Sequence, residues 1–379
     1  MSATGANAEK SAVQKCWVST PGSSCGIRWG EGAIDLAGKI SRDVVGRPKR
    51  ALVVIGPNAD ADLVEYVTKL LVGEEFLLHT FTLDHAGEKI CSLASATELF
   101  ETFAAHDLTQ DDLCLVIGDV KLISLASYAC SQWCNTLPLV VVPTDEVALL
   151  RGATTPLGIT VASKPQMINV HACAKNALME PEICIHELDS ESSREARVLM
   201  VSTAVAQSEK EFSALWDEAE HLMNGDSLLM LERLCETTKG RGHLVSSTSI
   251  AIRESVRYGE DIAEALMRLV PPATPFSTVL AESLRFSARL SVGLGKLSVD
   301  DMLAQDELLE MLEIPTLHAA LDAKEVVRAI RETRFLRTNR FMVLIPETLG
   351  RVRLANVDDD LLLEHVGAWC DAMASEEEI

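Results

Sequence analysis

Two acidic side chains, Glu260 and Glu264, have the spacing of metal ligands on one face of a predicted helix. Residues four apart are neighbours on a helix surface, and carboxylate oxygens are ligands that magnesium and manganese accept. An ordinary solvated acidic face fits the same spacing, and the sequence favours it, because Arg257 and Arg268 lie within reach. No histidine occurs between residues 244 and 317, so this region has no imidazole ligand for zinc.

A second candidate for chemistry is Cys173, which stands beside His171. A nucleophile needs its base within hydrogen-bond reach, and neighbouring side chains in a loop seldom achieve this geometry, so a buried neutral thiol is the better interpretation. The sequence has no G-x-S-x-G, P-loop or HExxH motif. The ten cysteines form no CxxC pair, which indicates reduced thiols in a cytoplasmic protein.

The formal charge of −22 argues against a nucleic-acid partner or an anionic membrane surface, because phosphates require a basic face. No apolar run reaches the ~18 residues that a membrane span requires. Residues 1–15 are small and polar without an apolar signal core, and we expect a disordered tail there.

Strands and helices alternate over residues 16–188, which predicts a parallel, Rossmann-like sheet. The expected strands are Ala51–Ile55, Phe76–Phe81, Leu113–Ile117, Leu137–Val142 and Ile183–Ile185. Between the first two, apolar residues at helical spacing predict a helix that ends at Gly73. Residues 189–379 form the second domain, helical in pattern over 192–335, with an isolated strand at Phe341–Ile345 and a final helix at Leu361–Trp369. The fold class is therefore α/β, with a mostly α-helical C-terminal domain.

Several stretches, in order from about Gly26 to Met373, resemble 3-dehydroquinate synthase of the sugar-phosphate cyclase superfamily. The matching stretches are Gly87-Glu88 with Ser92-Leu93, Asp111 to Gly118, Leu137 to Thr144, Ala288 to Ser298, Leu308 to Thr316, and Val357 to Leu362. The resemblance implies the two-domain fold of that family and a shikimate-pathway lyase activity that eliminates phosphate from a seven-carbon sugar-acid phosphate. It also implies NAD, a bound divalent metal, substrate-holding cations between the domains, and a homodimer.

The metal ligands of that family are replaced here. Ser202 falls where the family has a glutamate, Glu260 and Glu264 match its GHTFGH histidines, and Phe276 matches the histidine of HGEAV. We therefore expect no metal ligands and no zinc.

The nucleotide site is partly changed. Asn58, Glu88 and Thr144 match positions that contact NAD in the family, and Gly118 is the remaining glycine of its GGGVIGD turn. Asp119 would place a negative charge near the NAD phosphates. The sequence thus favours loss of NAD binding over its retention.

Substrate-binding positions are better preserved. Lys164, Asn169, Lys175 and Asn176 match the family stretch GGKT..N....GKN if about seven residues are inserted after Pro143; otherwise Leu157, Ala172 and Cys173 take these places. Lys239 and Arg253 match its substrate-binding lysine and arginine, and Arg334 and Arg337 lie near its paired lysines. A residual pocket for a phosphate or carboxylate and ordinary surface cations remain alternatives.

Three hypotheses follow. The first is a pseudoenzyme that binds a small anion or a protein partner for a regulatory or structural end. The second is an active cyclase with a remodelled metal centre at Glu260 and Glu264. A polyol-type dehydrogenase fares worse, because that related family also needs histidine-rich metal ligands.

Overall fold

The structure is a computed structural model and describes residues 13–57 and 59–375. The chain forms two compact units: unit 1 comprises Ser23–Ile185 with the chain up to Val18, and unit 2 comprises Ser19–Gly22 with His186–Ile379. In the described part of the chain, no helix combines the length and apolar character needed to cross a bilayer.

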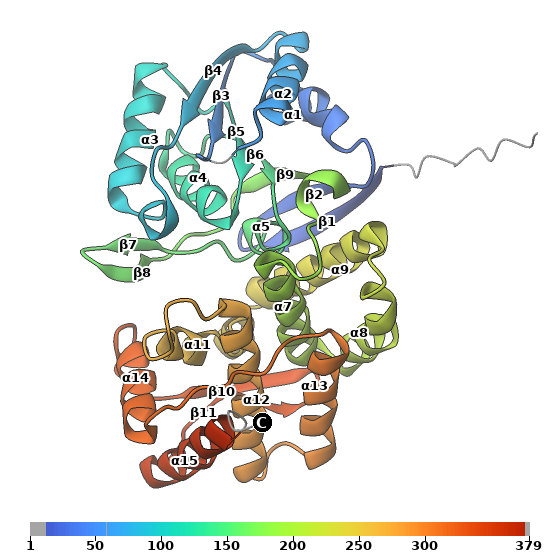
Figure 1. Cartoon of the computed structure of the whole chain (residues 1–379). Coiled ribbons are helices and arrows are strands. Elements are labelled where there is room, and N and C mark those ends of the chain that lie inside the picture. The colour runs from blue at the N-terminus through green and yellow to red at the C-terminus, as the bar shows by residue number, and fades with distance from the viewer. Residues whose placement is uncertain (1–12, 58, 376–379) are drawn as a thin grey trace, which may run out of the picture. The chain divides into compact units, whose positions relative to one another are not determined.

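Unit 1 is built on a seven-stranded sheet in the order β1-β2-β9-β6-β5-β3-β4 (Figure 1). Its strands are β1 (Gln14–Thr20), β2 (Ser23–Trp29), β3 (Arg50–Ile55), β4 (Leu77–Thr82), β5 (Leu113–Gly118), β6 (Leu139–Pro143) and β9 (Ala174–Met179). In the part of the sheet ordered β2-β9-β6-β5-β3-β4, each strand pairs in parallel with its neighbour. The central strands β5 and β6 are buried along their whole length, as expected for a parallel sheet covered on both faces.

Helices cover both faces of this sheet. They are η1 (Ile34–Leu36), α1 (Ala37–Val45), α2 (Ala61–Gly73), η2 (Gly87–Lys89), α3 (Leu93–Ala105), α4 (Val120–Gln132), α5 (Glu146–Gly152) and α6 (Pro181–Cys184). Figure 1 shows α1 and α2 on one side and α3 and α4 on the other. Val67 and Leu71 of α2 pack with Val53 and Leu115 of the sheet in the main core, all without solvent exposure.

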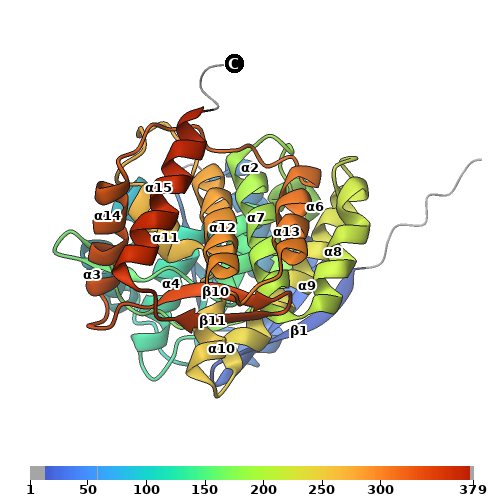
Figure 2. The ribbon, with the colours of Figure 1, turned by 90° about the horizontal axis from the view of Figure 1, so that it is seen from below.

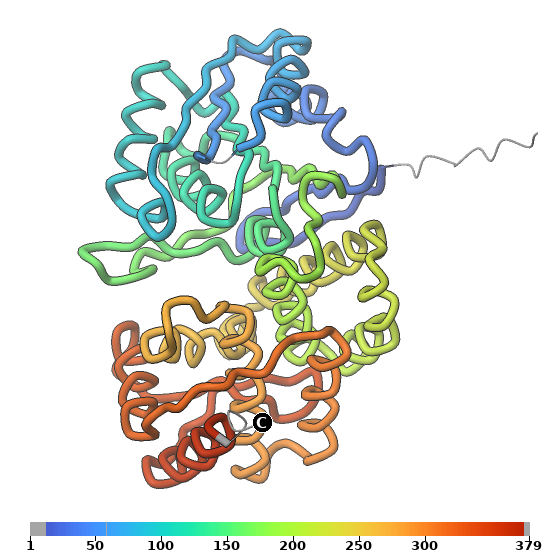
Figure 3. Tube along the Cα trace, viewed as in Figure 1, coloured from blue at the N-terminus to red at the C-terminus, as the bar shows by residue number. Residues whose placement is uncertain are grey.

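Between β6 and β9 the chain makes an excursion, which Figure 3 traces, through the antiparallel pair β7 (Ile159–Val161) and β8 (Lys164–Ile168). Sequence reasoning identified neither this pair nor β1, β2 and β9. The expected strand Ile183–Ile185 is wrong, because Pro181 starts the short helix α6 there, and the strand of this region is β9.

One smaller expectation also needs correction. Gln14 and Lys15, expected in the tail, belong to β1, while residues 1–12 lie outside the described residues. Helix α2 ends at Gly73, as expected, and the left-handed residue that follows is Glu75, with φ 69°.

Unit 2 is helical, with one small sheet. Its helices are α7 (Glu191–Gln207), α8 (Glu209–Leu222), α9 (Ser227–Ser246), α10 (Ile250–Ser255), α11 (Glu260–Leu266), α12 (Phe276–Gly293), α13 (Val299–Met311), α14 (Ala323–Phe335) and α15 (Asp359–Ser375). Figure 2 shows α12 in the middle of these helices, and it packs against α7, α11, α13 and α15. Its side chains are buried almost throughout, which explains why its sequence has no clear polar face.

The expected isolated strand at Phe341–Ile345 is β10 (Val343–Thr348), and it is paired antiparallel with β11 (Arg351–Ala355). Gly350, with φ 89°, occupies the turn between them, where its missing side chain leaves room for Ser208 and Glu209. The expected α/β class with a mostly helical second domain is confirmed.

Candidate functional site

The acidic segment that attracts attention in the sequence forms the first turns of α11 in unit 2. Gly259 precedes it with φ 86°, and a Cβ atom there would lie 2.6 Å from Leu284 Cδ2. Only glycine fits this turn without strain, and the turn places Arg257 beside the helix that follows it. Glu260 is buried at 8% exposure.

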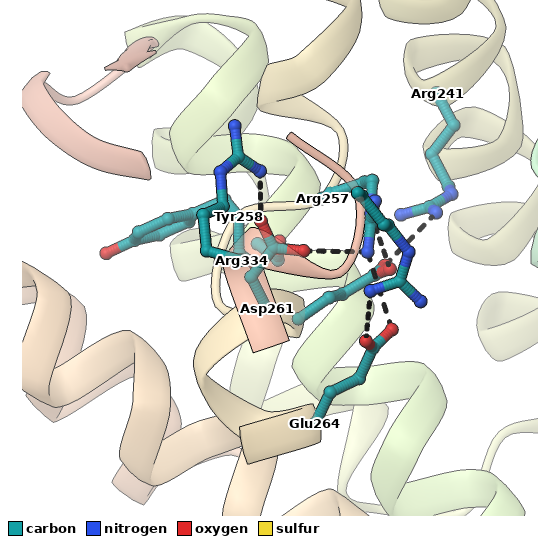
Figure 4. Close-up of polar contacts among 9 residues, drawn as sticks. Arg241, Arg257, Tyr258, Asp261, Glu264 and Arg334 are labelled. Atoms are coloured by element: carbon teal, nitrogen blue, oxygen red, sulfur yellow. Dashed lines mark hydrogen bonds and ion pairs between the residues drawn. The ribbon is translucent and has the colours of Figure 1, made fainter. Parts of the chain in front are cut away.

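Three carboxylates of α11 converge on the guanidinium of Arg257 (Figure 4). Arg257 Nη2 lies 2.7 Å from Asp261 Oδ1 and 3.4 Å from Glu264 Oε1, and Arg257 Nε lies 3.8 Å from Glu260 Oε2. These acids stand three, four and seven residues after Arg257, which lies in the turn before α11.

The second oxygen of each carboxylate contacts a different arginine. Arg241 Nη2 is 3.8 Å from Glu260 Oε1, Arg334 Nη1 is 2.7 Å from Asp261 Oδ2, and Arg337 Nη1 is 2.9 Å from Glu264 Oε2. Arg241 comes from α9 and Arg334 from α14, so the contacts join three helices. These seven residues are called the Arg257 cluster below: Arg241, Arg257, Glu260, Asp261, Glu264, Arg334 and Arg337.

Burial and charge act against each other in this cluster. Burial by itself would lower the pKa of Arg257, but Asp261, Glu260 and Glu264 together raise it, so the guanidinium stays protonated. Burial raises the pKa of Glu264, and the opposing effect of Arg257 and Arg337 is smaller. The cluster is therefore a network of ion pairs that is partly shielded from solvent.

The residues that the resemblance matches to metal ligands have these surroundings. Ser202 is buried and donates its hydroxyl proton to the carbonyl oxygen of Tyr258 at 2.9 Å. Phe276 begins α12, and its neighbour Ser277 donates from its N–H and hydroxyl groups to Glu191. Within residues 13–57 and 59–375, no group of three or more His, Cys, Asp or Glu side chains has the geometry to hold a metal ion.

Both carboxylates of the metal site suggested for Glu260 and Glu264 contact arginines. The expectation of a solvated acidic face is wrong in part. Glu260 is buried, and Arg268 contacts Glu332 in place of the acids of α11.

The candidate substrate-binding cations of unit 2 contact carboxylate or backbone carbonyl oxygens of unit 2. Lys239 Nζ lies 2.5 Å from Glu236 Oε1, and Arg334 contacts Asp261. Arg253 donates to the carbonyl oxygens of Ser247, at 2.8 Å, and of Thr248. Of these three, the structure brings only Arg334 into the Arg257 cluster.

A small surface depression adjoins this cluster within unit 2. Arg257, Asp261 and Arg334 line its polar side, and apolar residues of α14 and the β10 segment, including Ile330 and Leu344, line the other. The depression thus joins two guanidinium groups to an apolar wall.

The candidate substrate residues of unit 1 lie along β8, β9 and the segment between them. Lys164 is exposed in β8, and Asn169 Nδ2 lies 3.4 Å from His171 Nε2. Lys175 donates to Ser23 Oγ at 3.3 Å, and the next residue, Asn176, turns toward Gly26, where a Cβ atom would come within 2.6 Å of its Oδ1. Adjacent strand residues point to opposite faces, so Lys175 and Asn176 do not converge.

The turn after β5, which the resemblance matches to the nucleotide-binding turn, contains the N-cap residue of α4. Asp119 is the N-cap of α4, and its carboxylate accepts from Leu122 N at 2.9 Å. In a dinucleotide fold this helix N-terminus receives the pyrophosphate. Gly118 is tightly packed, since a Cβ atom there would lie 2.6 Å from Leu122 Cδ2. Asp119 therefore places a carboxylate at the N-terminus of α4.

The other NAD-type positions make local contacts. Glu88 is exposed and lies 2.7 Å from Lys121 Nζ, and the backbone N–H of Thr144 donates to the Gly118 carbonyl. Asn58 lies outside the described residues.

Cys173 and His171 do not form a nucleophile–base pair. Cys173 donates its thiol proton to Ser127 O at 3.3 Å, while the His171 ring contacts Asn169. Burial raises the pKa of the Cys173 thiol to about 12, so it stays protonated at neutral pH.

Sequence reasoning missed the Arg257 cluster as a unit, although it noticed Arg257 near the two glutamates. The signal was present in the spacing of Arg257, Glu260, Asp261 and Glu264. Nothing local marked Arg241, which has no solvent exposure in the middle of α9, as their partner.

No protein-family model matches the chain. A curated 3-dehydroquinate synthase from Microcystis aeruginosa is 21% identical over 360 residues, covering 89% of this chain and 93% of the relative. A second, from Cyanothece sp., is 22% identical over 334 residues, covering 84% of this chain and 88% of the relative.

Among solved structures, a 2-deoxy-scyllo-inosose synthase complexed with carbaglucose-6-phosphate, NAD+ and Co2+ matches with a TM-score of 0.78 and 14% identity, over 93% of this chain and 99% of that chain. A 2-epi-5-epi-valiolone synthase from Streptomyces hygroscopicus, with NAD+ and Zn2+ bound, matches with a TM-score of 0.76 and 15% identity, over 94% and 98%. An iron-containing alcohol dehydrogenase from Thermococcus thioreducens matches less well, with a TM-score of 0.59 and 13% identity, over 94% and 99%.

These likenesses run along nearly the whole chain, in both units, and the better structural matches are cyclases. The chain is similar to the 3-dehydroquinate synthases at low identity along most of its length, and it has the fold of the sugar-phosphate cyclases.

Proposed function

We propose that this protein is a cyclase-fold pseudoenzyme that has lost zinc-dependent dehydroquinate synthesis and binds a small anion for a regulatory or structural end. The Arg257 cluster carries the proposal. Glu260 and Glu264 stand at the family's histidine positions, and arginines hold both of them.

The arginines next to Glu260 oppose the binding of a divalent metal. In the family the ion polarises the reacting hydroxyl groups, and this requires ligands that neutralise it at short range. Here the charge next to Glu260 is already supplied by Arg241 and Arg257. A divalent cation approaching these guanidinium groups would be repelled, and the repulsion is strong in a partly buried site.

The depression beside Arg257 and Arg334 supports the anion-binding part of the proposal. The Arg257 cluster has four arginines and three acids, so the seven side chains carry one net positive charge, although all three acids contact Arg257 itself. A small carboxylate or phosphate with an apolar body matches both the remaining positive charge and the apolar wall.

The test is a phosphate-release assay. Purified protein is incubated with the seven-carbon sugar-acid phosphate, NAD+ and a panel of divalent metals, beside an intact 3-dehydroquinate synthase as a positive control. We expect release at the level of the protein-free blank. Release that Lys239→Ala abolishes would overturn the pseudoenzyme proposal.

A second candidate is an active cyclase with a remodelled centre. It is favoured by the two cyclase structures of the same fold that contain NAD+ and a divalent metal. Under this alternative, NAD+ and one metal of the panel would raise the melting temperature and support turnover. The same samples, run by size-exclusion chromatography with light scattering, test the homodimer that the resemblance implies.

A further inference from the structure

We infer that the guanidinium of Arg257 serves unit 2 as an internal counter-ion in the place of a divalent metal, so that the fold of this unit is independent of metal. The inference uses the same cluster as the proposed function but concerns what holds the helices together, so either can fail while the other stands.

The oxygen partners give the first argument. Each carboxylate of α11 gives one oxygen to Arg257 and the other to a separate arginine, as described above. Arg257 is therefore the one described residue in contact with all three acids, at distances from 2.7 to 3.8 Å. A metal ion shared by these acids would need the same central position.

Electrostatics give the second argument. Asp261 and Glu264 lie one turn apart on α11, and without a cation between them the two carboxylates would repel each other. Arg257, whose side chain is 28% exposed, supplies that cation as part of the chain. A covalently attached cation needs no uptake from solution and cannot be removed by a chelator.

The elements that the cluster joins give the third argument. Arg241 extends from α9 without solvent exposure, Arg334 extends from α14, and both reach α11 acids. Removing Arg257 would leave each of these acids with a single arginine contact among those described. Breaking part of a dehydrated ionic network weakens the whole packing around it.

The test uses the full-length protein. Wild type is melted after dialysis against EDTA and then with Mn2+, Co2+ or Zn2+ added, and bound metal is measured by elemental analysis. We expect the same melting temperature in every condition and far less than one ion per chain. A stoichiometric ion, or stabilisation by metal that Glu260→Gln removes, would overturn the inference.

A double-mutant cycle separates a counter-ion from simple packing. Arg257→Met keeps most of the side-chain volume but removes the charge, and Asp261→Asn removes its nearest acid. Arg257 and Asp261 contact each other, so each single substitution already breaks their contact. We therefore expect the double variant to change the unfolding equilibrium constant by about tenfold less than the product of the two single-variant changes. Arg268→Met, on an arginine that contacts Glu332 instead, is the matched control and should combine with Asp261→Asn multiplicatively.

A second variant keeps the test decisive if Arg257→Met does not fold. Arg257→Lys keeps the charge without the planar fork, and it should fold and melt between wild type and Arg257→Met. If Arg257→Met does not fold while Arg257→Lys does, charge is required and the inference stands. Multiplicative effects in the cycle, or a methionine variant as stable as the lysine variant, would contradict it.

Discussion

Ser202 and Tyr258 are joined by a buried hydrogen bond: the Ser202 hydroxyl donates to the Tyr258 carbonyl oxygen at 2.9 Å. Both residues are essentially without solvent exposure. The Tyr258 hydroxyl in turn donates to Gln305 Oε1 at 2.9 Å. Ser202, which the resemblance matches to a glutamate ligand, therefore links α7 to the turn that precedes α11.

The first prediction concerns this bond. Ser202→Ala leaves a buried carbonyl without its donor and should cost about 1 kcal/mol of unfolding free energy. Ser202→Glu, which restores the family's residue, should cost more, because it buries a carboxylate. Urea unfolding measures both. Ser287→Ala is the control, since Ser287 bonds only the carbonyl of Ser283 in its own helix, and a smaller loss is expected there. An unchanged stability for Ser202→Glu would contradict the assigned environment.

A second prediction concerns the cap of α4. Asp119→Ala should cost about 1 kcal/mol, because the N–H of Leu122 loses its acceptor, whereas Asp119→Ser keeps a capping oxygen and should cost less. The serine variant also removes the negative charge from the helix N-terminus, where a pyrophosphate would be favoured. We therefore expect NAD+ to raise the melting temperature of Asp119→Ser more than that of wild type. Equal responses would show that Asp119 is not what opposes NAD+.

The third prediction is a pH dependence at the edge of the unit 1 sheet. The rings of His79, on β4, and His106 stack with their centroids 3.9 Å apart. Burial lowers the pKa of His79 below its usual 6.5, and His106 and Arg50 lower it further. The unfolded chain then binds a proton more readily than the folded chain, so this residue's contribution to stability is lost as the pH falls from about 6.5 toward the folded-state pKa. His79→Gln should lose less stability than wild type between pH 7 and 5 in urea titrations. Parallel curves for the two proteins would refute the lowered pKa.

A fourth prediction separates the thiols. Cys134 is the one cysteine that is exposed in the described part of the chain, and burial raises the pKa of Cys25, Cys91 and Cys173 to about 12. A thiol-specific reagent at pH 8 should label one fast site in native protein, and Cys134→Ser should remove that fast phase. Fast labelling that persists in Cys134→Ser and disappears in Cys173→Ser would revive a reactive Cys173.

Much of the sheet could be predicted from local pattern. Val53 and Leu115 lie in short β-branched or apolar runs between turn residues, and such runs form buried parallel strands wherever helices cover both faces. The strand β9 could not be found this way. Its sequence, AKNALM, has no strand preference of its own, and it is a strand because β2 and β6 pair with it on both sides.

The sequence by itself determined the fold class and the family likeness, because these depend on residue identity and order along the chain, and it predicts the replacement of the metal-ligand residue types. Only the tertiary structure decided what the replacing residues do. Arg334 and Asp261 are 73 positions apart, and Arg241 reaches Glu260 from another helix. Contacts between such distant residues follow from how the helices pack, and no local pattern encodes which charge will meet which.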